Sequence, residues 1–222
     1  MISALRFRWA QLRNRSTELA PYYRAGRADL ARDYRQARML ALDLELTGLD
    51  PQQDQILSIG CVPIEQGRLQ LSQAHDQVVL INGEVGDSCT IHGIRDRDMA
   101  AGIPLAQALS DLIPMLAGRV LICHNARLDL AFLQQGLRRC FGQGLPLMAV
   151  DTLSLELKRF AQRDETPKAD ALQLGRCRAR YELPNYPGHH ALVDAIACGE
   201  LLLAQASAMS GRHTLSLGRL LR

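Results

Sequence analysis

Two acidic residues, Asp43 and Glu45, interrupt an otherwise apolar run over residues 39–46. A run this short and this apolar predicts a central strand covered on both faces. Residues two apart on a strand point to the same side of the sheet, so the two carboxylates are expected to share one face. Two like charges in a partly buried place repel each other, and no lysine or arginine lies within the run. A bound divalent cation would compensate both charges. The structural alternative is that one acid caps a helix and the other meets a distant arginine.

Two further acids stand where a strand is expected to end and a helix to begin. Asp129 lies in the segment 124–133, and Asp194 lies in the segment 188–195. Taken singly, each is best explained as a partner of a helix dipole or as an ordinary surface residue. Four carboxylates considered together favour a metal site, because hard divalent cations prefer oxygen ligands.

The elements that would position these acids follow from hydrophobic periodicity and turn residues. Strands are expected over 39–46, 55–64, 68–80, 119–124 and 147–150, with a tight turn at Gln66-Gly67 that joins the second to the third. Helices are expected over 104–116, 126–140, 152–160, 171–181 and 190–209, and Asp151-Thr152 is expected to cap the third. This order predicts an α/β fold with a mixed five-stranded sheet flanked by helices.

The composition is that of a globular protein, with 222 residues of which 47% are hydrophobic and 22% are charged. No uncharged apolar stretch reaches the roughly 18–20 residues of a membrane span. Arginines at 6, 8, 13 and 15 interrupt any apolar region of a secretory signal. The six cysteines form no Cys-x-x-Cys pair and are expected to be reduced core residues. We therefore expect a cytoplasmic protein with no membrane partner.

The net charge of +3 is unevenly distributed along the chain. Residues 1–38 hold nine arginines and three acids, a net of +6, and the remainder has a net of −3. The same segment carries five aromatic residues: Phe7, Trp9, Tyr22, Tyr23 and Tyr34. Such a segment could lie along phosphates and stack on bases. The alternatives are an extension that packs its aromatics on the main domain or, less in keeping with its three acids, an organelle transit peptide. We expect a basic, helical N-terminal extension over 1–37.

Three blocks of the chain resemble those of the DEDDh 3′–5′ exonucleases. Residues 43–49 read Asp-x-Glu-x-Thr-Gly-Leu, residues 124–133 read His-Asn-Ala-x-x-Asp-x-x-Phe-Leu, and residues 189–194 read His-x-Ala-x-x-Asp. Segments 91–94 and 151–153 are also similar to the proofreading (epsilon) subunit of bacterial DNA polymerase III and its stand-alone relatives. The resemblance covers about residues 38–206. It implies an RNase H-like fold and metal-dependent removal of nucleotides from a 3′ end.

The family pattern also implies a role for each acid. Asp43 would bridge two divalent cations, Mg²⁺ or Mn²⁺. Glu45 and Asp194 would complete the site that holds the attacking water, and Asp129 would serve the ion at the leaving group. Thr47 would lie where the 3′ nucleotide approaches.

Two histidines have candidate roles. His189 is the candidate general base, because an imidazole with an ordinary pKa near 6.5 can accept a proton at neutral pH. Its neighbour His190 is the rival, and the spacing to Asp194 favours His189. His92 matches a substrate-contacting position of the proofreading subunits.

Departures from the proofreading subunits bear on partners. Leu46 stands where many of them have threonine, and the segment 43–51 is close to the first block of oligoribonucleases. Only 28 residues follow Asp194, which argues against the long tail that grips a polymerase. No clear clamp-binding peptide stands near the end. We expect an exonuclease domain over 38–210 and a short tail over 211–222.

These observations predict a free-standing 3′–5′ exonuclease of the proofreading or repair type that releases nucleoside 5′-monophosphates from single-stranded DNA. DNA is favoured over RNA as the nucleic-acid partner. An RNA-trimming exoribonuclease or oligoribonuclease of the same family is the first alternative. A phosphatase for free nucleotides and a catalytically silent nucleic-acid-binding module are the others. A polymerase or clamp partner and the oligomeric state are left open.

Overall fold

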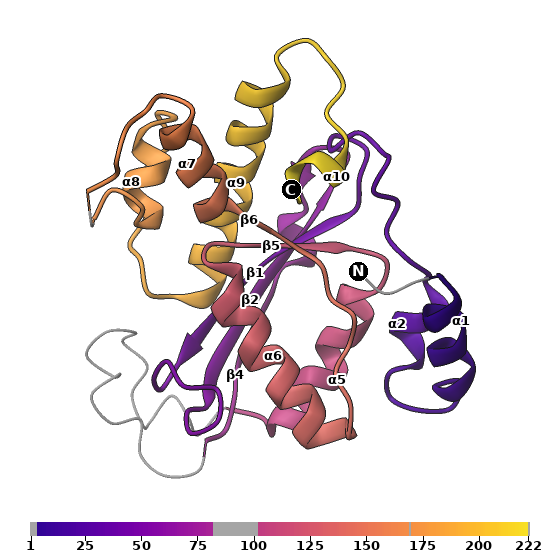
Figure 1. Cartoon of the computed structure of the whole chain (residues 1–222). Coiled ribbons are helices and arrows are strands. Elements are labelled where there is room, and N and C mark those ends of the chain that lie inside the picture. The colour runs from indigo at the N-terminus through magenta and orange to yellow at the C-terminus, as the bar shows by residue number, and fades with distance from the viewer. Residues whose placement is uncertain (1–3, 82–101, 169, 222) are drawn as a thin grey trace.

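The computed structural model describes residues 4–81, 102–168 and 170–221. His92 and Cys89 lie outside the described residues. The elements, shown in Figure 1, are α1 (Ala4–Arg13), α2 (Ala20–Arg24), β1 (Met39–Leu46), β2 (Ile56–Glu65), β3 (Arg68–Leu69), η1 (Leu71–Gln73), β4 (His75–Val78), α5 (Leu105–Leu116), β5 (Val120–Cys123), α6 (Ala126–Phe141), β6 (Ala149–Asp151), α7 (Thr152–Ala161), α8 (Leu174–Ala179), α9 (Ala191–Ser210) and α10 (Leu217–Leu220).

The predicted mixed sheet is confirmed. Its order is β3-β2-β1-β5-β6, and β4 also pairs with β2. β1 runs antiparallel to β2 and parallel to β5, which in turn runs parallel to β6. The third expected strand is divided, so the described residues form a sheet of six strands where five were expected. The division arises because the amides of Gln73 and Ala74 donate to carbonyls of a 3₁₀ turn instead of to β2.

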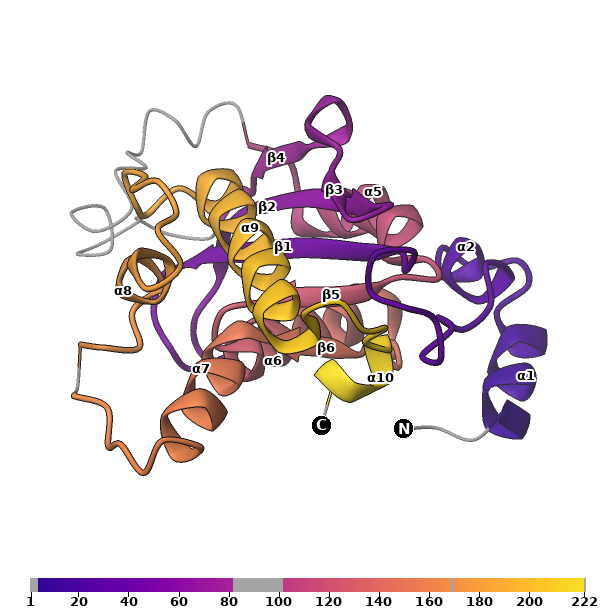
Figure 2. The same cartoon turned by 90° about the horizontal axis from the view of Figure 1, so that it is seen from above.

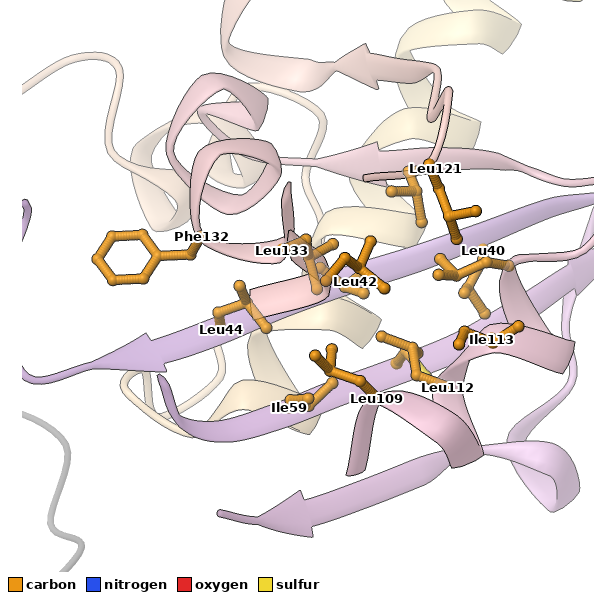
Figure 3. Packing of buried hydrophobic residues seen from close by; sticks show 14 of the residues in the cluster. Leu40, Leu42, Leu44, Ile59, Leu109, Leu112, Ile113, Leu121, Phe132 and Leu133 are labelled. Atoms are coloured by element: carbon orange, nitrogen blue, oxygen red, sulfur yellow. The ribbon is translucent and has the colours of Figure 1, made fainter. Parts of the chain in front are cut away.

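Alternate residues of β1 face two different helical layers. The even-numbered residues, all leucines, pack with α5 and α6 in one apolar cluster (Figure 3). The odd-numbered Met39 and Ala41 belong to a second cluster with α9, which crosses the opposite face of the sheet (Figure 2). Asp43 and Glu45 continue the odd-numbered series toward the end of the strand. The acids therefore lie on the α9 face, where the apolar core stops.

The helix on that face, α9, is unusually apolar for a helix that carries a candidate ligand. Its most apolar window has a mean hydropathy of 1.4, and its length would suffice to cross a membrane. In this structure Cys198, Leu202 and Ala206 of α9 are buried in the second core cluster. Packing against both β1 and β2 therefore accounts for the apolar character of this helix.

The N-terminal extension contributes to the core of the domain. Phe7, Tyr22 and Tyr23 are buried in the cluster of α5 and α6, and Tyr34 is buried in the cluster of α9. Only Trp9 of its five aromatic side chains is exposed, with 60% of its surface accessible. Four of the rings that could have stacked on bases are therefore occupied by packing.

The segment after α9 is held by the N-terminal extension. The amide of Leu215 donates a 2.8 Å hydrogen bond to Oδ2 of Asp33, and Asp33 and Ser216 form an antiparallel bridge. Leu217 and Leu220 of α10 are buried in the α9 cluster. The expected tail at 211–222 therefore packs against the domain as far as its residues are described.

Candidate metal and active site

Three of the four candidate acids meet at one point of the fold. Asp43 and Glu45 extend from β1, and Asp194 extends from the first turn of α9. One carboxylate oxygen of each lies within 4.8 Å of the others. Glu45 is buried, with 4% of its surface accessible, whereas Asp43 and Asp194 are half-buried. The structure thus brings a strand pair and a helix start, about 150 residues apart in the chain, to one candidate cation site.

The fourth acid, Asp129, approaches from the other helical layer. It lies in the first turn of α6 and is buried, with 5% of its surface accessible. Burial is the main reason why the pKa of Asp43 is raised well above its ordinary value, and the charge of Asp129 is the next. Asp129 is therefore an electrostatic neighbour of Asp43, brought to it by α6.

The carboxylates of Asp43, Glu45 and Asp129 are poorly suited to ionisation without a cation. Burial raises the pKa of Glu45 to about 7, and the charge of Asp194 adds to the effect. Burial likewise raises the pKa of Asp129 to about 7, with a contribution from Asp151. No ion pair among the described residues includes Asp43 or Asp129. Clustered hard oxygen donors that repel one another fit a divalent metal ion, which would take the place of protons.

A glycine on β2 allows Asp194 to reach β1. Gly60 pairs with Asp43 across the two strands. A Cβ atom at Gly60 would lie 2.1 Å from backbone atoms of Ala191 and Leu192, at the start of α9. Sequence analysis missed this residue, although a glycine inside an apolar strand is a known sign of close backbone approach.

The two adjacent histidines point to different surroundings. The backbone amide of His189 donates a 2.7 Å hydrogen bond to Oδ2 of Asp194. His189 also lines a pocket of about 450 Å³ together with Asp43 and Asp194. The ring of His190 instead has Nε2 3.6 Å from Oδ2 of Asp76, on β4. The geometry therefore keeps His189 as the candidate base.

A hydrogen-bonded network supports the ends of β5 and β6. The two ring nitrogens of His124 contact Oγ1 of Thr152 and the carbonyl oxygen of Leu172, each at 2.8 Å. Oδ1 of Asp151 accepts a hydrogen bond of 2.9 Å from the amide of Asn125, the residue before α6. Sequence analysis predicted Asp151 as a helix cap, and its Oδ1 does accept a 3.1 Å hydrogen bond from the amide of Leu153. Asp151 thus ties together the starts of α6 and α7.

Of the two candidate substrate contacts, Thr47 and His92, the structure describes only Thr47. Oγ1 of Thr47 accepts a 2.9 Å hydrogen bond from the amide of Gln55 and donates to Oδ1 of Asp54 at 3.3 Å. Thr47 therefore fixes the loop that follows β1, two residues after Glu45. His92 lies outside the described residues.

Comparison with known proteins gives the family from the sequence and the fold from the structure. The RNase T family model, described as Exonuclease, matches residues 40–202. The chain is 27% identical over 171 residues to the PolC-type DNA polymerase III of Thermotoga petrophila, a match that covers 77% of this chain and 12% of that protein. It is 29% identical over 171 residues to the DNA polymerase III subunit epsilon of Treponema pallidum, covering 72% of this chain and 73% of that protein. The chain thus spans a small part of the PolC-type relative and most of the epsilon subunit.

A solved structure shows the same fold. The crystal structure of E. coli exonuclease I in complex with a dT13 oligonucleotide matches with a TM-score of 0.65 and 16% identity, over 78% of this chain and 41% of that chain. The expected RNase H-like fold is therefore confirmed. The match to the family model confirms the resemblance found in the sequence.

Proposed function

Because the chain belongs to the RNase T exonuclease family, we propose that it is a 3′–5′ exonuclease that releases nucleoside 5′-monophosphates from the 3′ end of single-stranded DNA. The observation that carries the proposal is the carboxylate cluster of Asp43, Glu45 and Asp194, with Asp129 beside it. The epsilon subunit and the PolC-type polymerase among its relatives support DNA and a proofreading or repair setting.

Two divalent ions, Mg²⁺ or Mn²⁺, fit the four acids. Asp43, Glu45 and Asp194 would hold one ion, and Asp43 would share the second with Asp129. When bound, such ions lower the pKa of a water molecule and stabilise negative charge on a departing oxygen. The carboxylates themselves would lose their mutual repulsion on binding, because the positive charge replaces the protons that burial otherwise favours.

The other residues of the chain would move the proton and hold the strand. His189 would accept the proton of the attacking water at a ring nitrogen. As the water oxygen bonds to phosphorus, the bond from phosphorus to the 3′ oxygen of the penultimate nucleotide breaks, and that oxygen takes up a proton from solvent. The products are a nucleoside 5′-monophosphate and a strand shortened by one, with a new 3′ hydroxyl. The loop that Thr47 pins would receive the terminal nucleotide, and His92 would contact it.

The proposed surroundings follow from the same relatives. Nucleic acid is the partner, DNA before RNA, and the cytoplasm is the compartment in which we place the enzyme. The relatives leave a polymerase or clamp partner open, and the described C-terminal segment is packed against the domain.

The test uses one single strand labelled at its 3′ end and one labelled at its 5′ end, each as DNA and as RNA, with Mg²⁺, Mn²⁺ or EDTA. We expect immediate release of labelled mononucleotide from the 3′-labelled DNA, a shrinking ladder from the 5′-labelled DNA, and neither in EDTA. The Asp43→Asn protein is the control for a contaminating nuclease. Faster shortening of RNA would assign the enzyme to RNA trimming. No metal-dependent shortening of either polymer would leave a nucleic-acid-binding module as the better account.

A further inference from the structure

A buried arginine lies beside the candidate active site. Arg178, on α8, has 2% of its surface accessible and lines the same pocket as His189, Asp43 and Asp194. A buried guanidinium is tolerated only when its N–H groups are hydrogen-bonded and its charge is paired. The acceptors of its hydrogen bonds therefore identify the segments that Arg178 links.

The partners of Arg178 come from two separate parts of the chain. Nε and Nη2 donate to the carbonyl oxygen of Pro184, at 3.3 and 2.8 Å. Nη1 donates to the carbonyl oxygen of Ala197 at 2.6 Å, and Nη2 pairs with Oε2 of Glu200 at 2.8 Å. Pro184 precedes His189 by five residues, whereas Ala197 and Glu200 follow Asp194 on α9. One side chain thus fastens the approach to His189 onto the helix that carries Asp194.

Tyr186 contacts both Arg178 and Glu200. Its ring lies against the guanidinium of Arg178, with 4.5 Å from the carbon of that group to the ring centre. Its hydroxyl donates to Oε1 of Glu200 at 3.1 Å. Both oxygens of Glu200 are therefore used, one by Arg178 and one by Tyr186. We call Arg178, Tyr186 and Glu200 the loop clamp.

The far end of this segment needs such support. His189 has a φ of +68°, in the left-handed region that residues other than glycine rarely adopt. Its amide is held by Asp194, as described above. A strained conformation persists only where the surrounding structure enforces it. The clamp fixes the segment at Pro184, and α9 fixes it at His189.

We propose that Arg178 is a positioning residue, which holds residues 183–189 on α9 so that His189 stays in the pocket that Asp43 and Asp194 also line. The inference rests on the proposed role of His189 as general base. A planar guanidinium is required, because a lysine ammonium cannot reach the carbonyls of Pro184 and Ala197 and the carboxylate of Glu200 in one fixed geometry.

Arg180 provides a matched control at the end of the same helix. Its Nε pairs with Oε2 of Glu156 at 2.8 Å, and its Nη2 donates to the carbonyl oxygen of Ala171 at 2.7 Å. Glu156 is fully buried on α7 and also accepts from Tyr181. Arg180 is thus hydrogen-bonded and ion-paired, as Arg178 is, but its partners lie on α7, on α8 itself and in the segment before α8.

The experiment combines Arg178→Lys and Arg180→Lys, separately, with His189→Ala. We measure kcat and KM on a 3′-labelled DNA strand at saturating Mn²⁺, and amide hydrogen exchange of residues 183–189 in the metal-free protein. We expect Arg178→Lys to lower kcat about 10- to 100-fold with little change in KM, because a misplaced catalytic group loses this much. In the His189→Ala background the same change should have no further effect on kcat. Exchange over 183–189 should rise in Arg178→Lys and stay unchanged in Arg180→Lys.

Three results would count against the inference, and they are distinguishable. If His189→Ala lowers kcat and Arg178→Lys lowers it again by its full factor, Arg178 does not act through His189, and the proposed function stands. Unchanged exchange over 183–189 would likewise show that the clamp does not hold the segment. If His189→Ala leaves kcat intact, the proposed base is wrong and the inference falls with it. If Arg178→Lys folds poorly, Glu200→Gln is used in its place, because it weakens the loop clamp at a partly exposed position of α9. The same comparison in the His189→Ala background then applies.

Discussion

The raised pKa of Glu45 makes the stability of the metal-free protein depend on pH. Its pKa is about 7 in the folded state, against an ordinary value of 4.5. The folded state therefore keeps a proton up to about pH 7 that the unfolded chain releases near pH 4.5. The stability of the metal-free protein should fall as the pH rises through this window, by on the order of 3 kcal/mol from this group alone.

Glu45→Gln should remove that loss, since the amide cannot ionise. Urea unfolding in EDTA at pH 5 and pH 8 measures it: the variant should lose less stability than the parent between the two values. Metal added at pH 8 should stabilise the parent more than the variant. Equal pH dependence in the two proteins would show that Glu45 ionises normally in the fold.

The adjacent histidines give the second prediction at this scale. His189→Ala should lower kcat by about 10²- to 10⁴-fold, as expected for a general base, while Mn²⁺ binding measured by calorimetry stays close to that of the parent. His190→Ala should change kcat little, because its ring faces Asp76. Equal losses in the two variants would contradict the assignment.

Individual residues were predictable to the extent that their partners are local in sequence. The shared face of Asp43 and Glu45 follows from the period of a strand, and the structure has them there. Arg178 gave no such signal, because its burial depends on where α9 lies and its sequence neighbours are those of an ordinary basic helix. Gly60 carried a readable signal that the sequence analysis did not use.

At the scale of elements, the contact between β2 and α9 sets the distance between two ligands. A methyl group at Gly60 would meet backbone atoms, which cannot rotate away as a side chain can. Gly60→Ala should therefore push the first turn of α9, with Asp194, away from Asp43. We expect a destabilisation of about 1–3 kcal/mol, a weaker affinity for Mn²⁺ and a kcat at least about tenfold lower.

Val62→Ala is the matched control for that change. Val62 lies two residues further along β2, in the cluster with α9, and is fully buried. Its truncation should lower stability by a similar amount while Mn²⁺ affinity and kcat are retained. If both variants lose activity in proportion to their loss of stability, Gly60 does not set the position of α9.

The expected elements agree with the observed ones where periodicity is long and differ where it is short. The helices over 126–140 and 190–209 were found at Ala126–Phe141 and Ala191–Ser210. The strand over 68–80 was divided, because Leu71–Gln73 satisfies its hydrogen bonds within a local turn that no apolar period reveals. The helix over 171–181 is shorter, at Leu174–Ala179, since the segment before it is held by Arg180 and His124.

For the whole molecule, the N-terminal extension combines two properties that the sequence left as alternatives. Its buried rings are part of the core, so removing residues 1–38 would unfold the protein before it tested any binding role. Its charge is nevertheless at the surface. Arg8, Arg15 and Arg24 are exposed and line a hollow of about 460 Å³ between α1 and α2. Substitution of these three arginines therefore tests the binding role without disturbing the packing of the buried rings.

The position of that hollow makes the last prediction depend on strand length. In Figure 2 α1 and α2 lie at the end of the sheet opposite to α8, which borders the site. The eight residues of β1 span about 26 Å at ~3.3 Å each. A strand stacked as in helical DNA, with a rise of ~3.4 Å per nucleotide, must therefore exceed about eight nucleotides before it can reach both places. For a 20-nucleotide strand, replacing all three arginines by glutamine should flatten the dependence of log K on log salt by about 2, at roughly 0.7 per phosphate contact. For a five-nucleotide strand it should change neither binding nor kcat, and equal effects on both lengths would show that the arginines act on the fold or on the site.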